Sequence, residues 1–409
     1  NYVRETAERY GVDSRIRFGC EMLESSWDEA DGRWHVRSNQ GSFSCDVLVS
    51  AIGATAEPDE PDIPGLEDFA GHRFHSARWD HEHDLSGERV AVIGTGPAAA
   101  QFIPAIQPAV GRLDVFQRTP PWVIPHPDRP VPWGERQLYR LLPPLQDLQR
   151  NALFLLYEGA GVGFRGREAL IAPLEALGRL HLRRQVSDPA LRQALTPDYR
   201  FGCKRPILSN SYYPALAADN CELVTAPIER VDKDAVVTAD GERRGVDTII
   251  TAIGYRYSRS LLVDRIVGRD GRTMRGVWDE SPRAFLGATV PGFPNLFTIT
   301  GPQSPSVLTN MPVAIEQHVE WITDCIDAMR KEGKTRIEAT PDAQDAWVAH
   351  VNEAIGGTLF PTANSWYMGA NIPGKPRTFL PYLGPEGVGG YRKKCDEIAA
   401  KGYEGFVLA

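Results

Sequence analysis

Two apolar runs that end in Ala-Ile-Gly stand out in the hydrophobic pattern of the chain. Residues 46–53 (DVLVSAIG) and 247–254 (DTIITAIG) are near copies of each other, and each follows a polar stretch punctuated by turn residues. An apolar run of this length that ends in a tight turn is typical of a buried parallel strand. In a doubly wound nucleotide-binding domain, such a strand completes a sheet that begins with a Gly-rich strand–turn–helix unit.

One such opening unit is present in the sequence. Residues 88–93 form a third apolar run, which leads into the Gly-rich turn 94–99 (GTGPAA) and then into an expected helix over 98–106. This unit is the partner of the second copy. We therefore predict an α/β protein with two dinucleotide-binding, Rossmann-like domains, the first of them incomplete because its Gly-rich unit would lie upstream of residue 1. The alternative is that 47–53 is merely a similar-looking strand.

Prolines and the helical pattern set the expected domain boundaries. Prolines after residue 57 mark a linker, and 138–156 and 170–182 carry apolar residues at helical spacing. The expected parts are a first dinucleotide-binding domain at 1–57 and 256–409, an interdomain linker at 58–86, a second dinucleotide-binding domain at 87–129 and 199–255, and a helical insertion at 130–198.

The overall charge and the cysteine pattern exclude several classes of function. The 409 residues carry a formal net charge of −8, so the chain lacks the basic field that would attract nucleic acid or an anionic membrane. The longest apolar run, near 152–157, is far too short to span a bilayer. The six cysteines are scattered without a C-x-x-C pair, so we expect neither disulfides nor a metal site, and we expect a cytoplasmic location.

The Gly-rich turn carries the first candidate chemistry. Gly94 and Gly96 allow a tight turn and a close approach of the backbone to a pyrophosphate, and Ala99 allows close packing of helix against strand. The N–H groups at the start of the helix would then face the anion. A Gly-rich turn without a ligand is the alternative. The candidate dinucleotide-binding residues here are Gly94, Thr95, Gly96, Pro97, Ala98, Ala99 and Gln101.

Cationic residues follow at two places where they could bind the phosphate groups of a nucleotide. Arg118 and Thr119 stand at the end of the next strand, where NAD-binding domains usually place a carboxylate for the ribose 2′-hydroxyl. A guanidinium there favours the 2′-phosphate of NADPH, although a solvated surface arginine is also common. Lys204 and Arg205 are adjacent, so on an extended segment they would point to opposite sides. Taken alone, that pair is more typical of a surface loop.

A second motif stands between the linker and the Gly-rich turn, and the two together resemble a known family. Residues 69–80 read F-x-G-x3-H-x3-W-D, followed by G-x-G-x-x-A at 94–99. In this order the pair resembles the Baeyer–Villiger monooxygenases, which are class B flavoprotein monooxygenases. The resemblance covers essentially the whole chain. It implies that the first domain binds FAD and the second NADP(H). The motif residues are Phe69, Gly71, His75, Trp79 and Asp80.

The resemblance also implies roles for single residues. The Q-R-T-P element at 117–120 matches an element of the family. The resemblance also implies that Lys204 contacts the 2′-phosphate and that Arg205 stabilises the negatively charged, oxygenated flavin. His75 would respond to domain rotation, although a packed linker is the plainer reading. The remaining cofactor candidates lie in the Gly-Pro turn, at the start of the helix expected over 314–329, and in the loop 365–377: Gln303, Asn310, Met311 and Trp366.

The reaction implied by the resemblance is Baeyer–Villiger oxidation. NADPH reduces FAD, the reduced flavin reacts with O2, and one oxygen atom is inserted into a ketone to give an ester or lactone. Two alternatives stay open: a related enzyme that oxygenates nitrogen or sulfur, and an NADPH-binding fragment without catalysis. No residue can be assigned to the flavin pyrophosphate turn, or to the acidic residue that family members place upstream to modulate the active-site arginine. Neither the particular ketone nor the oligomeric state follows from the sequence.

Overall fold

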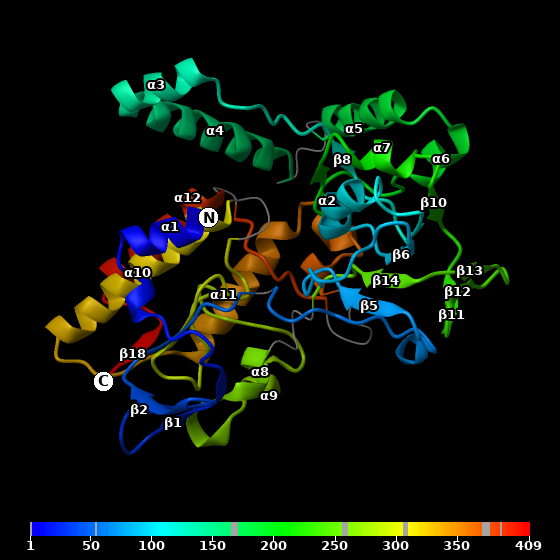
Figure 1. Cartoon of the computed structure of the whole chain (residues 1–409). Helices are drawn as coiled ribbons and strands as arrows, with labels where there is room; N and C mark the ends of the chain where they lie inside the picture. The colour runs from blue at the N-terminus through cyan, green and yellow to red at the C-terminus, as the bar shows by residue number, and fades with distance from the viewer. Residues whose placement is uncertain are drawn as a thin grey trace.

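A five-stranded parallel sheet forms the centre of one half of the molecule (Figure 1). A computed structural model describes residues 2–53, 55–164, 171–255, 261–305, 310–369, 377–384 and 387–409. Every neighbouring pair of strands in this sheet is parallel. In spatial order the strands are β10 (Cys221–Val224), β7 (Arg112–Phe116), β6 (Arg89–Ile93), β14 (Thr248–Thr251) and β5 (His72–His75).

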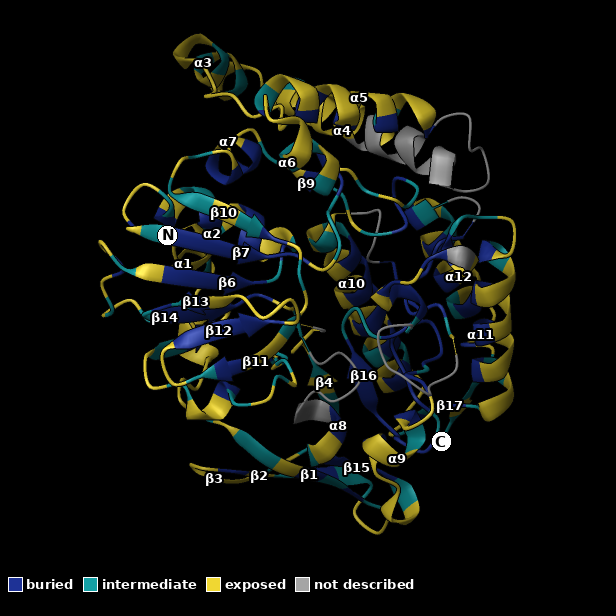
Figure 2. Ribbon diagram, turned by 90° about the vertical axis from the view of Figure 1, so that its right-hand side faces the viewer, coloured by how far each residue is buried: buried dark blue, intermediate teal, exposed yellow. Residues whose placement is uncertain are grey.

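Both faces of this sheet are covered, which explains why its strands read as continuous apolar runs (Figure 2). Val90 and Val92 of β6 pack in one hydrophobic cluster with α2 (Pro97–Ile106) and α7 (Tyr212–Leu216). Ala91 and Ile93 of the same strand belong to a cluster on the other face. That face is covered by an antiparallel meander: β11 (Ile228–Asp232), β12 (Ala235–Thr238) and β13 (Arg243–Gly245).

The structure differs from the predicted linker at 58–86. Residues 72–75 form the edge strand β5, which pairs in register with β14 from Thr248↔His72 to Thr251↔His75. Leu66, in the short helix η2 (Leu66–Asp68), is buried against the meander side of the sheet. A strand of four residues leaves too short a pattern to recognise, and only the partner strand β14 makes it part of the sheet.

The predicted helical insertion lies between β8 (Val123–Ile124) and β9 (Ile207–Leu208), which pair in parallel as a separate two-stranded sheet. The single helix expected over 138–156 is instead two helices that lie side by side (Figure 1), because Pro143 and Pro144 end the first and begin the second. Among the described residues, no helix is both long and apolar enough to cross a membrane. The helices are α3 (Trp133–Leu141), α4 (Pro143–Phe164), α5 (Ala172–Gln185) and α6 (Pro189–Ala194).

The other half of the molecule is built from residues near both ends of the chain. The predicted strand at 46–53 appears as β4 (Leu48–Ser50), which pairs in parallel with β16 (Leu296–Thr298). A second sheet combines the antiparallel strands β1 (Met22–Asp28), β2 (Arg33–Ser38) and β3 (Gly41–Cys45) with β15 (Ile266–Val267). Trp34 at its centre is fully buried, and its Nε1 donates to the carbonyl oxygen of Pro294.

Helices from the C-terminal part build the largest hydrophobic core. Trp321, Trp347 and Tyr391 are buried there, one on each of three helices. The helices are α10 (Met311–Lys331), α11 (Pro341–Ile355) and α12 (Gly387–Ala400). Smaller elements complete this half: α1 (Tyr2–Arg9), η1 (Asp13–Arg15), α8 (Leu261–Arg265), η5 (Arg269–Gly271), α9 (Met274–Trp278), β17 (Ile337–Ala339), η6 (Phe360–Thr362), η7 (Trp366–Met368) and β18 (Phe406–Leu408).

Candidate functional site

The Gly-rich turn between β6 and α2 has the geometry of an open anion site. Gly94 adopts a φ of +115°, and a Cβ there would lie 2.5 Å from the carbonyl oxygen of Ala252, so a larger residue would not fit. Gly96 is the N-cap of α2, and a Cβ at Gly96 would meet no heavy atom within 4 Å. The N-terminal N–H groups of α2 therefore stand behind open space, where they can face a phosphate.

The residues around the two glycines divide into buried and exposed positions. Thr95 is buried, and its Oγ1 donates to the carbonyl oxygen of Thr119 at 3.3 Å, which ties the turn to the end of β7. Ala99 is fully buried, so α2 packs closely on the sheet. The exposed residues on the first turns of the helix are Pro97, Ala98 and Gln101.

The structure brings Arg118 and Lys204 together at this turn. Arg118 is exposed and stands next to Thr119, the residue that Thr95 contacts. Lys204 is half-buried, and its Nζ lies 4.9 Å from the centre of the Tyr199 ring. Burial lowers the pKa of Lys204, and the nearby positive charge of Arg118 lowers it further. The charge of Asp198 opposes this effect, and an additional anion beside Arg118 and Lys204 would be stabilised by both cations.

Arg205 faces a different neighbour from Lys204. It is exposed, and its charge opposes the effect of burial, which raises the pKa of Tyr367. Tyr367 in turn contacts Trp366, with ring centres 4.5 Å apart. Trp366 is 40% exposed at the start of the predicted loop 365–377, of which residues 370–376 lie outside the described residues. Tyr199, the ring beside Lys204, also raises the pKa of Tyr367, so the two adjacent cations lie near a shared pair of tyrosines.

Gln303 lies in the Gly-Pro turn that the sequence analysis singled out. Its side chain is fully buried, where Oε1 accepts from the backbone N–H of Ala284 at 2.9 Å and Nε2 donates to the carbonyl oxygen of Pro282 at 3.1 Å. Its backbone carbonyl accepts from Trp347 Nε1 at 3.3 Å. These internal bonds satisfy the side-chain amide and fix the turn, and the assignment of Gln303 to a cofactor site stays a prediction.

Asn310 and Met311 stand at the beginning of α10. Asn310 is the exposed N-cap, but its side chain makes no capping hydrogen bond. Met311 is the first residue of the helix and is partly exposed. The N–H groups at this end of α10 are therefore not covered by the cap side chain, and the helix dipole would favour negative charge beside them.

The residues of the motif at 69–80 fasten β5 to its surroundings. A Cβ at Gly71 would lie 2.5 Å from the Phe69 ring, so the ring packs directly over the glycine. Trp79 makes edge-to-face contacts with Phe74 and Phe102, at ring-centre distances of 5.0 and 5.2 Å. These contacts join β5 to α2 by aromatic packing.

The two polar residues of the motif have separate partners. Nδ1 of His75 accepts from the backbone N–H of Ala77 at 3.0 Å, and burial lowers the pKa of His75. His75 also lines a cavity of about 360 Å³. Asp80 lies 3.1 Å from Nε2 of His72. His75 thus belongs to the packed junction around β5, which fits a positioning role better than direct catalysis.

Comparisons with known proteins agree on one family. A Baeyer–Villiger monooxygenase of Streptomyces coelicolor is 38% identical over 373 residues, which is 90% of this chain and 72% of the relative. An acetone monooxygenase (methyl acetate-forming) of a Gordonia species is 34% identical and is matched over all of this chain and 83% of its own length. No protein-family model matches the chain.

The chain belongs to the Baeyer–Villiger monooxygenases.

Solved structures of this family share its fold. A closed crystal structure of cyclohexanone monooxygenase superposes with a TM-score of 0.89 at 30% identity, over all of this chain and 83% of the other. A steroid monooxygenase bound to NADP superposes with a TM-score of 0.86 at 32% identity, with the same two coverages. The mixed α/β architecture with parallel sheets is therefore the architecture of Baeyer–Villiger monooxygenases.

One buried network in this monooxygenase was missed by the sequence interpretation. Nδ1 of His318 accepts from the backbone N–H of Thr300 at 3.2 Å, and its Nε2 lies 2.7 Å from the Tyr391 hydroxyl. His318 comes from α10 and Tyr391 from α12, so two helices support the turn that follows β16. A histidine on the apolar face of a predicted helix was the available signal.

This network predicts acid sensitivity of the fold. Burial lowers the pKa of His318 to about 4, although the carbonyl oxygen of Thr298 raises it. The unfolded chain takes up a proton near pH 6.5 and the folded chain only near pH 4, so protonation favours the unfolded state within this window. We expect the folded state to lose about 3 kcal/mol from this residue as the pH falls from 7 to 4.

Urea unfolding of wild type and His318→Asn between pH 7.5 and 4.5 checks this expectation. The variant is less stable at pH 7.5, but the difference in free energy of unfolding between the two proteins should shrink toward acid. A difference that stays constant with pH would contradict it.

Proposed function

We propose that this chain is an NADPH- and FAD-dependent monooxygenase that inserts one oxygen atom of O2 into a ketone to give an ester or lactone. The observation that carries the proposal is an open Gly-rich turn at the start of α2, together with Arg118, whose charge acts on Lys204, and the adjacent Arg205. Relatives with this activity in their names, acetone and cyclohexanone monooxygenases, match the chain over nearly its entire length.

We assign the nucleotide site to the parallel sheet. The backbone of Gly94–Ala99 would hold the pyrophosphate at the N-terminus of α2, and Arg118 and Lys204 would bind the 2′-phosphate of NADPH. The residues after β7 are Gln117, Arg118 and Thr119, so the carboxylate that NAD-binding domains place at this point is replaced by a guanidinium. Two cations beside an uncapped helix end fit a dinucleotide with an additional phosphate.

We assign the flavin side to the residues beyond Arg205. FAD supplies the redox chemistry and the reaction with O2, as in a related structure solved with FAD and NADP. The start of α10, with Asn310 and Met311, would stabilise negative charge on the flavin ring. Trp366 would cover the nicotinamide and limit the access of water. Arg205 would place a fixed positive charge where negative charge develops on oxygen.

This assignment divides the chain into a FAD-binding domain at 1–57 and 256–409, an NADP-binding domain at 87–129 and 199–255, a connecting segment at 58–86 and a helical insertion at 130–198. Both dinucleotide domains would be Rossmann-like. The parallel pairing of β4 with β16, which joins residues 48–50 to residues 296–298, supports one domain built from both ends of the chain. The scattered cysteines, all six unpaired, support a cytoplasmic location.

Loss of the ammonium group in Lys204→Ala is expected to weaken NADP+ binding by about 10- to 100-fold, because a charge-assisted contact with the 2′-phosphate is lost. Affinity for NAD+, which lacks that phosphate, should change little. Isothermal titration of both nucleotides measures the two affinities. Lys233→Ala, on the exposed turn between β11 and β12, is the control and should leave both unchanged. Equal weakening for NAD+ and NADP+ would contradict the assignment of Lys204.

Product analysis tests the reaction itself. The purified protein is given NADPH, FAD and O2 with a cyclic ketone, an aryl ketone, a tertiary amine and a sulfide. We expect a lactone or ester from a ketone, identified by mass spectrometry with one atom of 18O from labelled O2. An N-oxide or sulfoxide as the sole product would instead indicate the nitrogen- and sulfur-oxygenating branch.

A further inference from the structure

The segment that carries Lys204 and Arg205 is fastened at both of its ends by Trp122. The indole Nε1 of Trp122 donates to the carbonyl oxygen of Tyr199 at 2.8 Å, before the two cations. The backbone carbonyl of Trp122 accepts from the N–H of Ile207 at 2.8 Å, after them. The pairing of β8 with β9 continues from that second contact.

A buried carboxylate from the helical insertion holds the same segment near its beginning. Oε1 of Glu175, on α5, accepts from Arg200 Nε at 2.7 Å and from the backbone N–H of Phe201 at 3.2 Å. Its Oε2 accepts from Arg179 at 3.3 Å. Glu175 is only 7% exposed, whereas the side chains of Arg179 and Arg200 are 49% and 43% exposed, so the carboxylate is buried beneath two partly exposed guanidinium groups.

The contacts of α5 with Trp122 leave little freedom for movement. A Cβ added at Gly178 would lie 3.0 Å from the Trp122 ring, so helix and indole are in direct contact. The Arg179 guanidinium lies 5.3 Å from the centre of the same ring, and the Phe201 ring meets it edge to face at 5.8 Å. Figure 1 shows α5 beside β8, which follows Trp122.

The charge state of Glu175 agrees with this geometry. Burial alone would raise its pKa, but the hydrogen bonds from Arg200 and the Phe201 N–H outweigh burial, and the pKa lies below its ordinary value. The carboxylate is therefore ionised at neutral pH and neutralises Arg200. This negative charge lies beside Arg200, four residues before Lys204 and five before Arg205.

We propose that Glu175 is a positioning residue of the enzyme, which acts through Arg200 and Phe201 to fix the direction of Lys204 toward the nucleotide and of Arg205 toward the flavin side. The helical insertion thereby has a function in cofactor selectivity. This inference rests on the proposed function, since it assumes that Lys204 binds the 2′-phosphate. Glu175 itself touches neither cofactor.

The test is the ratio of the dissociation constants for NAD+ and NADP+, measured by isothermal titration on the full chain. We expect Glu175→Ala to weaken NADP+ binding about tenfold and NAD+ binding less than twofold, because only the 2′-phosphate contact depends on the direction of Lys204. Glu175→Gln keeps an acceptor for the Phe201 N–H but loses the charge, and should lie between wild type and the alanine variant. If the alanine variant does not fold, the same ratio of dissociation constants is measured on Glu175→Gln.

A matched control separates positioning from general destabilisation. Arg244→Ala removes a buried residue that pairs with Asp114 of β7 in the same domain. Arg118 lies beyond the last residue of that strand, Phe116. Arg244→Ala should lower the melting temperature and leave the nucleotide ratio at the wild-type value. A Glu175→Ala protein whose ratio stays within twofold of wild type would overturn the inference alone. A wild-type protein that does not prefer NADP+ would overturn the proposed function and the inference with it.

Discussion

Removal of the guanidinium in Arg205→Ala is expected to lower the rate of ester formation by about 10²- to 10³-fold, while NADP+ affinity stays close to wild type. We assign Arg205 to the flavin side and Arg118 and Lys204 to the nucleotide; the charge of Arg205 acts on Tyr367, and that of Arg118 acts on Lys204. A fixed positive charge there stabilises negative charge on oxygen during the reaction, and it requires no reorganisation at that moment. Its loss therefore affects the oxygenation step more than binding.

Ester formation under 18O2 and NADP+ titration together measure this expectation. Arg205→Lys should retain more activity than Arg205→Ala, since it keeps the charge but loses the planar fork of donors. Arg184→Ala, at an exposed position of α5, is the control and should behave like wild type. If Arg205→Ala formed ester at a rate within threefold of wild type, the catalytic assignment of Arg205 would fail.

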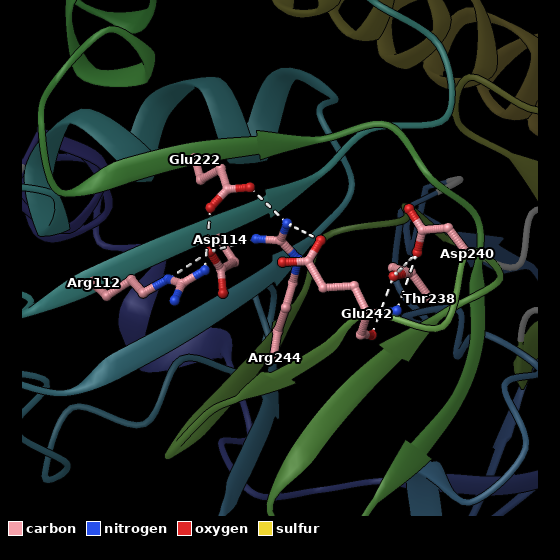
Figure 3. Close-up of polar contacts among 7 residues, drawn as sticks. All are labelled: Arg112, Asp114, Glu222, Thr238, Asp240, Glu242 and Arg244. Atoms are coloured by element: carbon pink, nitrogen blue, oxygen red, sulfur yellow. Dashed lines mark hydrogen bonds and ion pairs between the residues drawn. The ribbon is translucent and has the colours of Figure 1, made fainter.

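Arg244→Ala is expected to have the largest effect on stability, about 3 kcal/mol in the free energy of unfolding. Figure 3 shows Arg244 among three carboxylates, Asp114, Glu222 and Glu242. Arg244 is 5% exposed and Asp114 is 1% exposed, with Nη1 and Oδ1 3.3 Å apart. Truncation would leave the buried Asp114 carboxylate with only Arg112 as its partner. Burial already raises the pKa of Asp114, so the ionised form depends on these cations.

Urea unfolding at pH 7 measures the loss, with Arg112→Ala as the comparison. Arg112 is 43% exposed, so its removal should cost less, about 1 kcal/mol. In the double variant Arg244→Ala/Asp114→Asn, part of the loss should be recovered because no unpaired carboxylate remains buried. A loss below about 1 kcal/mol for Arg244→Ala would show that water reaches Asp114 in the folded protein.

Local sequence patterns were sufficient to predict the secondary structure of the Gly-rich unit. The apolar run, the two glycines and Pro97 predicted a strand, a turn and a helix, and β6 and α2 appear there. The reason is that a buried strand needs a continuous apolar run, and Gly94 needs a conformation that side chains disfavour. The helical pattern after 138 was also recognised, but the break at Pro143 was not.

The sequence analysis did not predict the contacts of residues whose partners are distant along the chain. The motif places Gln303 in a candidate cofactor site, but it does not show that the side-chain amide bonds with the backbone of Ala284 and Pro282. Glu175 and His318 were not singled out, because the partners Arg200 and Tyr391 lie 25 and 73 residues away along the chain. Neither periodicity nor a short motif records such a contact.

The sequence by itself determined the α/β class, the strand and Gly-rich turn of the nucleotide site, and, through two motifs, the family. These depend on near neighbours along the chain, where backbone sterics and the spacing of apolar residues act directly. Only the tertiary structure decided that β5 joins the main sheet, that Arg118 meets Lys204, and that Glu175 is buried against the segment that carries the cations. Those outcomes depend on burial and on charges brought together by folding, which no local pattern encodes.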